Sequence, residues 1–164
     1  MKLSLKGRAL KYLAAREHSR LELQRKLAPH AESAEQVDAA LDELEARGFL
    51  SAERFVESMV HRKAARFGAA RIQAELTQHR LPSDIAQAVV RTLRETELAR
   101  AQTLWVKRYG NVAQEPQDLA KQMRFLTARG FSSDVVRRVT RGKGASDDGG
   151  ADSDAHDTTD DDAP

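Results

Sequence analysis

The chain has 164 residues, of which 27 are Lys or Arg and 25 are Asp or Glu, so its formal net charge at pH 7 is +2. It contains no cysteine, which excludes disulfides, thiolate metal sites and a cysteine nucleophile. The N-terminus has no apolar core, and no stretch approaches the roughly 18 apolar residues of a membrane span. These features predict a soluble, cytoplasmic protein without a membrane segment.

The charges divide the chain into a basic body and an acidic C-terminal tail. Residues 142–164 carry eight aspartates and one lysine, a net charge of −7, whereas residues 1–141 carry 26 basic and 17 acidic side chains, a net charge of +9. The tail has no Val, Ile, Leu, Met or aromatic residue, so it cannot bury enough apolar surface to offset the entropy of ordering. We therefore expect a disordered tail, which either adds only solubility or competes with polyanions for the basic body.

The body is predicted to be all-α. Good helix formers dominate, and no segment shows the strict alternation of a half-buried strand. Ser19 with Glu22 and Ser33 with Gln36 have the spacing of capping boxes. Glycines stand where a left-handed helix end is expected, at Gly48 and Gly130. In chain order, these signals predict nine helices, over residues 5–16, 19–27, 33–47, 51–66, 69–80, 83–94, 96–109, 116–128 and 132–141.

Two segments of the body repeat each other at a separation of 50 residues. The sequence from Arg71 to Val89 aligns with that from Lys121 to Val139, and both contain Ser-Asp followed by a β-branched residue. The first part of the body matches less closely, with an offset of 49. Each helix has only a thin apolar stripe, so the helices must bury one another. We predict three tandem three-helix repeats in an elongated, curved array, at residues 1–50, 51–95 and 96–141, followed by the tail at 142–164.

Basic residues have a similar layout in the second and third repeats. Lys and Arg close the first helix of each, an aromatic residue and a glycine follow, and more basic residues occur in the next helix. If they fall at the same corner of successive repeats, they form a continuous basic surface for a phosphate backbone or an acidic protein groove. Taken singly, each equally well complements a helix dipole. The candidate partner- and DNA-binding residues are Arg62, Lys63, Arg66, Arg71, Lys107, Arg108, Lys121 and Arg124.

Catalytic and metal chemistry have little support in the sequence. The five histidines are scattered, with no pair at metal-ligand spacing, and there is no Gly-rich phosphate loop. We predict a protein that is not an enzyme and has no cofactor or metal. His61 and His79 are expected on solvated basic faces. Trp105 and Tyr109, one turn apart, are expected in the core of the third repeat rather than as a platform for stacked bases.

Several short motifs follow one another along the body. They are Ala9-Leu10-x-x-Leu13-x-x-Arg16-x-His18-Ser19-x-x-Glu22-Leu23-x-x-Lys26-Leu27, Phe55-Val56, Arg62 through Gly68-x-x-x-Ile72-x-x-Glu75-Leu76, Arg108-Tyr109-Gly110 and Lys121-x-x-Arg124-Phe125-Leu126-x-x-Arg129-Gly130-Phe131. In this order and spacing the chain resembles the bacterial RecX family over residues 8–141. It departs from that family in having Ser51-Ala52 where acidic residues are usual, and Arg80 where glycine is usual.

The resemblance implies a non-enzymatic modulator of the RecA recombinase. Such a protein binds the RecA filament on single-stranded DNA, lodges in its helical groove, and restrains ATP hydrolysis and strand exchange. We expect a monomer with weak, non-specific affinity for single-stranded DNA. The acidic residues of the first repeat either face basic recombinase surfaces or form a solvated helix face: Glu35, Asp38, Asp42, Glu43 and Glu45.

The alternative is a helical DNA-binding regulator of transcription, because three-helix units can resemble helix-turn-helix modules. A recognition helix presents Arg, Asn, Gln or Ser to base edges from its first turn. The third helices of the second and third repeats begin instead with Asp84 and Asp134, and a carboxylate there repels phosphate. This difference favours the RecA modulator.

Overall fold

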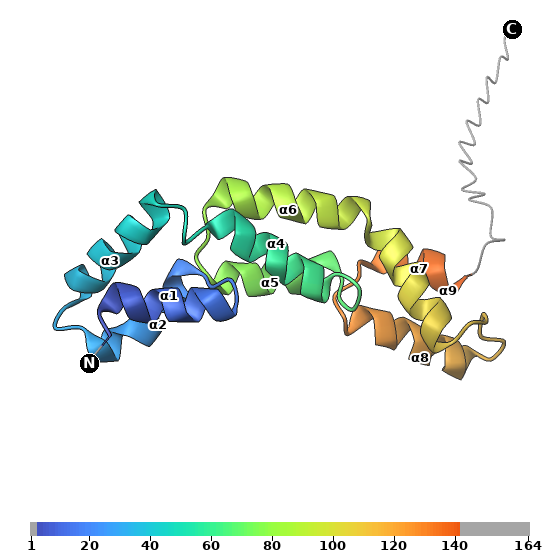
Figure 1. Ribbon diagram of the computed structural model, residues 1–164. Helices are drawn as coiled ribbons and strands as arrows, with labels where there is room; N and C mark the ends of the chain where they lie inside the picture. Colours follow the sequence, from blue (N-terminus) through green and yellow to red (C-terminus); the bar gives the residue numbers. More distant parts are fainter. Residues whose placement is uncertain (1–2, 142–164) are drawn as a thin grey trace, which may run out of the picture.

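The computed structural model describes residues 3–141, which fold into nine α-helices and one short 3₁₀ helix without a strand (Figure 1). The elements are α1 (Leu5–Ala15), α2 (Arg20–Leu27), η1 (Ala28–His30), α3 (Ala34–Ala46), α4 (Ala52–Lys63), α5 (Ala69–Gln78), α6 (Ser83–Glu95), α7 (Glu97–Arg108), α8 (Pro116–Thr127) and α9 (Ser133–Thr140). The predicted all-α fold is confirmed. The largest difference is the end of α4, which stops at Lys63 rather than at 66; beyond it the Arg66 N–H donates to the Lys63 carbonyl three residues back, the spacing of a turn rather than of an α-helix.

Each set of three consecutive helices buries an apolar core of its own. We call α1–α3 the first unit, α4–α6 the second unit and α7–α9 the third unit. Their largest buried side chains include Leu23, Leu27 and Leu41 in the first, Phe55, Ile72 and Leu76 in the second, and Trp105, Leu126 and Val139 in the third. The units follow one another in an elongated, curved row (Figure 1), which confirms the predicted tandem repeats. The predicted acidic tail lies outside the described residues.

The helix caps predicted from the sequence are largely present in the structure. The Ser19 hydroxyl accepts the Glu22 N–H at 3.2 Å, and the Ser19 N–H donates to the Glu22 carboxylate at 3.1 Å, which completes a capping box. Burial opposes the charge of Glu22, but hydrogen bonds from Arg16 and from Ser19 outweigh it and lower the pKa of Glu22. The second box is only half formed. Ser33 accepts the Gln36 N–H at 3.4 Å, whereas the Gln36 side chain accepts from the residue before Ser33.

The aromatic residues of the third unit belong to its core, as predicted. Trp105 is buried, and its indole N–H donates to the Gln122 side-chain oxygen at 2.9 Å. Tyr109 packs edge-on against Phe125, with ring centres 5.4 Å apart. The Gln122 amide in turn donates to the Asn111 carbonyl at 3.1 Å. These contacts occupy both rings within the protein and fix the connection between α7 and α8.

Candidate functional site

The first and second units meet where the corner between α1 and α2 packs against the turn between α5 and α6. Ser19 is buried there and shares a 2.9 Å hydrogen bond with Nδ1 of His79. The His79 ring lies 4.7 Å from the centre of the Phe55 ring. The prediction that His79 lies on a solvated face is therefore wrong. Its contact with Ser19 joins residues 60 positions apart, which no local pattern reveals.

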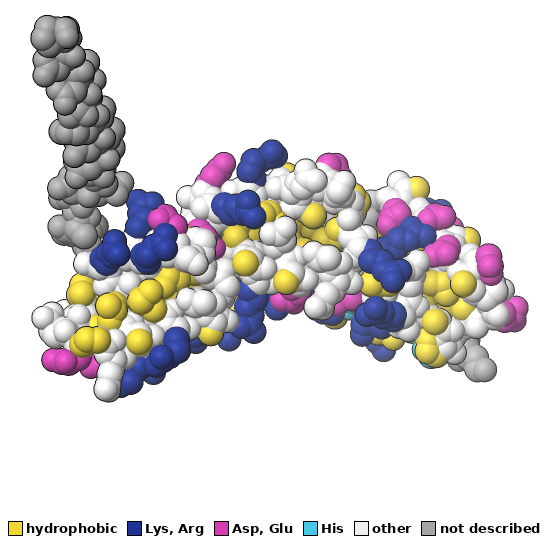
Figure 2. Space-filling view, turned by 180° about the vertical axis from the view of Figure 1, so that it is seen from behind, with side chains coloured by type: hydrophobic (Ala, Val, Ile, Leu, Met, Phe, Trp, Pro, Cys, Tyr) yellow, Lys and Arg dark blue, Asp and Glu magenta, His cyan; other side chains and the backbone are white. Residues whose placement is uncertain are grey.

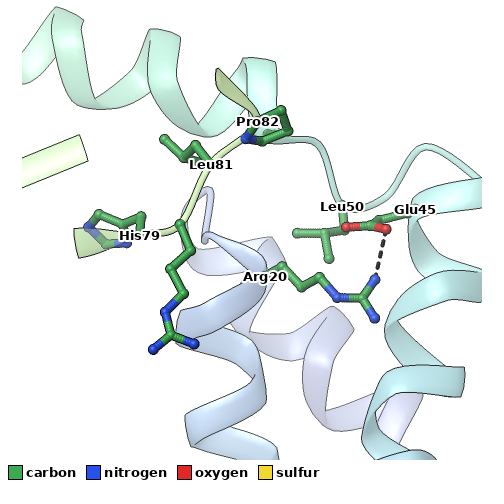
Figure 3. Close-up of a pocket in the computed structure, with 8 residues that line it drawn as sticks. Arg20, Glu45, Leu50, His79, Leu81 and Pro82 are labelled. Carbon is green, nitrogen blue, oxygen red and sulfur yellow. Dashed lines mark hydrogen bonds and ion pairs between the residues drawn. The ribbon is translucent and has the colours of Figure 1, made fainter. Parts of the chain in front are cut away.

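A pocket of about 340 Å³ lies beside this first joint (Figure 3). On one side Arg20 extends from α2 and pairs with Glu45 at 2.8 Å. On the other side His79 and Pro82 line the pocket from the turn between α5 and α6. The pocket is therefore built by both units, and its shape depends on the joint.

The acidic residues predicted on the first unit are largely paired within that unit. Arg20 lies 2.7 Å from Asp42, 2.8 Å from Glu45 and 3.3 Å from Asp38. Glu43 bonds to Lys6, which lowers the pKa of Glu43. Because these carboxylates already have basic partners, the geometry favours a charged helix face over a free acidic surface.

The second and third units meet in close backbone contact. Gly68, at the corner between α4 and α5, donates its N–H to the Arg129 carbonyl at 2.8 Å. A Cβ on Gly68 would overlap the Gly130 carbonyl group, and a Cβ on Gly130 would lie 2.6 Å from Cβ of Arg71. The Arg71 guanidinium donates to the Ala128 carbonyl at 3.3 Å. The two glycines thus allow an approach that any side chain would prevent.

The two joints repeat one arrangement. Ser19 and Gly68 are both N-caps of the second helix of their units. His79 and Arg129, which they contact, both lie in the turn between the second and third helices of the next unit. The units are therefore joined head to tail, each corner resting on the following turn.

Two side chains of α7 that the sequence did not single out reinforce the second joint. The Arg100 guanidinium donates to three carbonyls at the ends of α4 and α6, at 2.6 to 2.7 Å: those of Ala64, Phe67 and Leu93. Burial lowers the pKa of Arg100, and the nearby Glu97 charge opposes that shift. Glu97 is itself buried and accepts the Ala69 N–H at the start of α5, at 2.8 Å. A charged residue in a helix gives no sign in sequence that it will cap helices of a neighbouring unit.

The eight predicted basic residues do not form one cluster. Six lie on α4, α5, α8 and the corner between α4 and α5, and two lie at the C-terminal end of α7. Arg71 is engaged at the joint itself, as described above. Lys63 pairs with Glu75 at 2.6 Å, and Lys121 pairs with Asp118 at 2.9 Å. The remaining five are exposed and form no ion pair with any residue in the range 3–141: Arg62, Arg66, Lys107, Arg108 and Arg124.

The basic corners of the second and third units occupy different environments. The corner of the second unit lies inside the row, against the third unit, whereas Lys107 and Arg108 lie where the row ends. Figure 2 shows Lys and Arg side chains in separate groups along the face it presents, with acidic and uncharged areas between them. On this face the basic surface is interrupted rather than continuous.

The first turns of the third helices present carboxylates. Asp84 stands in the first turn of α6 and Asp134 in that of α9. Asp134 lies 3.8 Å from both Arg137 and Arg138, farther along the same helix. A helix start of this kind offers acceptors where a base-reading helix needs donors.

The described residues show neither a metal centre nor a membrane span. Within residues 3–141, no three His, Asp or Glu side chains gather closely enough to hold a metal ion. None of the helices in that range combines the length and apolar composition needed to cross a bilayer.

Comparison with known proteins finds relatives along the whole body. Family models described as the first, second and third three-helix domains of RecX match residues 6–44, 53–90 and 95–140. The regulatory protein RecX of Leptothrix cholodnii is 58% identical over 139 residues, which cover 85% of this chain and 88% of that protein. The regulatory protein RecX of Ralstonia pickettii is 54% identical over 140 residues, again 85% and 88% of the two chains.

Solved structures agree with this assignment of the fold. The crystal structure of RecX from Lactobacillus salivarius has a TM-score of 0.69 and 20% sequence identity, and the match covers 84% of this chain and 92% of that chain. A crystal structure of another regulatory protein RecX has a TM-score of 0.67 and 25% identity, over 84% of this chain and 71% of the other.

Proposed function

This chain belongs to the RecX family of regulatory proteins, and we propose on that premise that it regulates the RecA recombinase by binding the RecA filament on single-stranded DNA. Bound there, it restrains ATP hydrolysis and strand exchange. It acts in the cytoplasm as a monomer, without catalysis of its own and with weak, non-specific affinity for single-stranded DNA.

The observation that carries the proposal is the elongated, curved row of units with exposed basic side chains on successive units (Figures 1 and 2). A long, narrow body can follow a helical groove and contact several filament subunits at once. Exposed guanidinium groups such as those of Arg66 and Arg124 attract the phosphate backbone of single-stranded DNA.

Regulation of transcription is the weaker alternative. A sequence-specific regulator needs a helix whose first turn donates hydrogen bonds to base edges. Asp84 and Asp134 occupy those turns in the second and third units. The carboxylates therefore favour a partner other than an operator.

The test is the rate of ATP hydrolysis by RecA on single-stranded DNA that contains no operator sequence. We expect the protein to lower this rate in a dose-dependent manner, and to the same extent on two strands of unrelated sequence. A protein that leaves hydrolysis unchanged, while it binds one DNA sequence selectively, contradicts the proposal and supports transcriptional regulation.

Charge reversal at Arg66 and Arg124 tests the proposed basic residues. Both are exposed, so the double variant Arg66→Glu/Arg124→Glu should change the free energy of unfolding by less than about 0.5 kcal/mol per site. Its affinity for single-stranded DNA at low salt should fall about tenfold, with a shallower salt dependence, because fewer counterions are released. Fluorescence anisotropy with a labelled oligonucleotide measures both quantities.

The matched control is Lys11→Glu/Arg25→Glu, which changes the net charge equally at exposed positions of the first unit. It should bind more tightly than the Arg66/Arg124 variant. Equal losses for the two variants would mean that only the total charge matters and that the proposed residues have no special role.

A further inference from the structure

The groove between α4 and α6 of the second unit is used neither by the joints nor by the exposed basic residues discussed above. It has a volume of about 630 Å³ and is largely open to solvent. Four apolar side chains form the floor of the groove. Val56 and Val60 lie one turn apart on α4, and Ile85 and Val89 lie one turn apart on α6. Ala88, small and exposed, keeps the space between them open.

The rim of this groove is acidic. Glu53 and Glu57 on α4 and Asp84 on α6 are all exposed, and none forms an ion pair within the part of the chain that the structure describes. Glu53 accepts only the Ser51 hydroxyl, at 3.0 Å. The only ionisable group of opposite type on the lining is His61, which is exposed as expected but lies on an acidic rim rather than on the predicted basic face. Within residues 3–141, three carboxylates without an ion pair therefore lie beside an apolar floor.

We propose that this groove docks a basic amphipathic helix of a protein partner. An apolar stripe on that helix would cover the valine and isoleucine floor, and its flanking Lys or Arg side chains would pair with Glu53, Glu57 and Asp84. The groove walls extend over about two helical turns, which suits a partner helix that contributes residues at i, i+3 or i+4, and i+7.

Charge excludes the other occupants. Nucleic acid is repelled by the acidic rim, and residues 142–164 of this chain, with eight aspartates and one lysine, are repelled as well. A symmetric contact with the same groove of a second copy would place like charges opposite each other. A basic helix of another protein is the occupant that the surface fits.

Under the proposed function this partner is RecA, and the inference rests on that function for the identity of the partner. The groove and the basic residues then have separate tasks, because the groove holds protein while the basic residues attract the DNA.

Cross-linking identifies the occupant directly, because the chain has no cysteine and a single thiol can be placed at will. A photo-reactive probe is attached to Ala88→Cys, in the groove, and to the control Gln87→Cys, which is exposed on α6 but does not line it. With RecA assembled on single-stranded DNA, we expect Ala88→Cys alone to cross-link a RecA peptide in which at least two Lys or Arg flank apolar residues. Cross-links from Ala88→Cys to the DNA or to an acidic peptide, or equal yields from the two positions, overturn the proposal.

Charge reversal gives the energetic test. Glu57→Lys on the rim is compared with Glu95→Lys, an exposed change of equal charge at the end of α6 outside the groove. We expect Glu57→Lys to weaken binding to the RecA filament about fivefold at low salt without weakening binding to single-stranded DNA alone, and Glu95→Lys to have no such effect. If the wild type binds the filament and Glu57→Lys binds it equally well, the groove proposal is overturned and the proposed function stands. If the wild type does not bind RecA, both are overturned.

Discussion

Arg80 adopts a backbone conformation that most side chains avoid. Its φ of +50° lies in the left-handed region, where Cβ crowds the next carbonyl, and no other non-glycine residue among 3–141 has a positive φ. Arg80 follows His79, whose ring contacts Ser19 of the first unit, so the strained residue lies beside the first joint. Glycine would adopt the same backbone conformation without this crowding, because it has no Cβ.

Replacement of Arg80 by glycine should therefore stabilise the protein. Relief of the left-handed strain outweighs the extra chain entropy of glycine, so we expect Arg80→Gly to raise the free energy of unfolding by about 0.5 to 1 kcal/mol. Arg80→Ala is the control, since it removes the side chain but keeps the strained Cβ, and it should give no gain. Urea denaturation measures both, and equal stabilities of the two variants would contradict the argument.

At the scale of single residues, prediction from sequence succeeded for local roles and failed for distant ones. The core positions of Trp105 and Tyr109 followed from their helical spacing. The roles of His79 and Arg100 did not, because their partners lie 60 and 36 positions away or belong to other helices. The sequence alone does not show whether a titratable side chain faces solvent or contacts a residue of a neighbouring unit.

At the scale of the helices, the sequence predicted well which helices exist and in what order, because caps, glycines and apolar periodicity are local signals. The left-handed glycines at the ends of α3 and α8, Gly48 and Gly130, have φ of +74° and +82°. The short helix η1 and the early end of α4 were missed. The first is a single turn that contains Pro29, and the second coincides with carbonyls that Arg100 of the next unit binds. The candidate site was predicted only as a set of basic residues. Which of these residues lie inside the row and which lie at its end depends on how whole units pack, and the sequence does not reveal that packing.

The second joint depends on the absence of a side chain at Gly68. Its φ is −75°, so the backbone suits any residue, and it is the close contact with the Gly130–Phe131 peptide group that demands glycine. We expect Gly68→Ala to lower the free energy of unfolding by about 1 to 3 kcal/mol, the usual effect of forcing an extra carbon into a packed interior. Denaturation with urea measures the change.

Gly48→Ala separates this effect from backbone strain. Gly48 has a positive φ, but a Cβ there would meet nothing within 4 Å, so the substitution should cost only about 1 to 2 kcal/mol from the left-handed conformation. The variants should also differ in hydrogen exchange. Gly68→Ala should expose amides of the α8–α9 turn, whereas Gly48→Ala should leave them protected. Unchanged protection in Gly68→Ala would argue against its place in the joint.

For the whole molecule, we predict an elongated monomer in solution. The helices have no heptad stripe long enough for a coiled coil, and the units contact only their neighbours in the row. Small-angle scattering should give a radius of gyration well above the roughly 15 Å of a compact chain of this length, with the mass of one chain. A compact particle or a stable dimer is the result that opposes this prediction.

The acidic segment 142–164 lies outside the described residues, but its charge leads to a prediction about the whole molecule. If this segment competes with phosphate for the basic body, truncation after Arg141 should tighten binding to single-stranded DNA severalfold at low salt. The gain should shrink as salt rises, because each contact is screened within about 8 Å at physiological ionic strength. If the truncated protein binds no more tightly than the intact one at low salt, the segment serves solubility alone.

Within residues 3–141, the head-to-tail joint leaves one unmatched surface at each end of the row, so a repeated corner on the third unit could in principle pack against the first unit of a second molecule. Interfaces of this kind do not close on themselves, so an identical corner on the last unit would seat on the first turn of another molecule and propagate a fibre. The last corner is different. It runs over residues 109–115, longer than the corners at 16–19 and 64–68, and turns at Gly110 with a φ of +76°. Among the described residues, the third unit thus differs from the first two in the connection that makes each joint, and shortening it to the length used between α4 and α5 should restore a corner able to pack against the first unit of a second molecule.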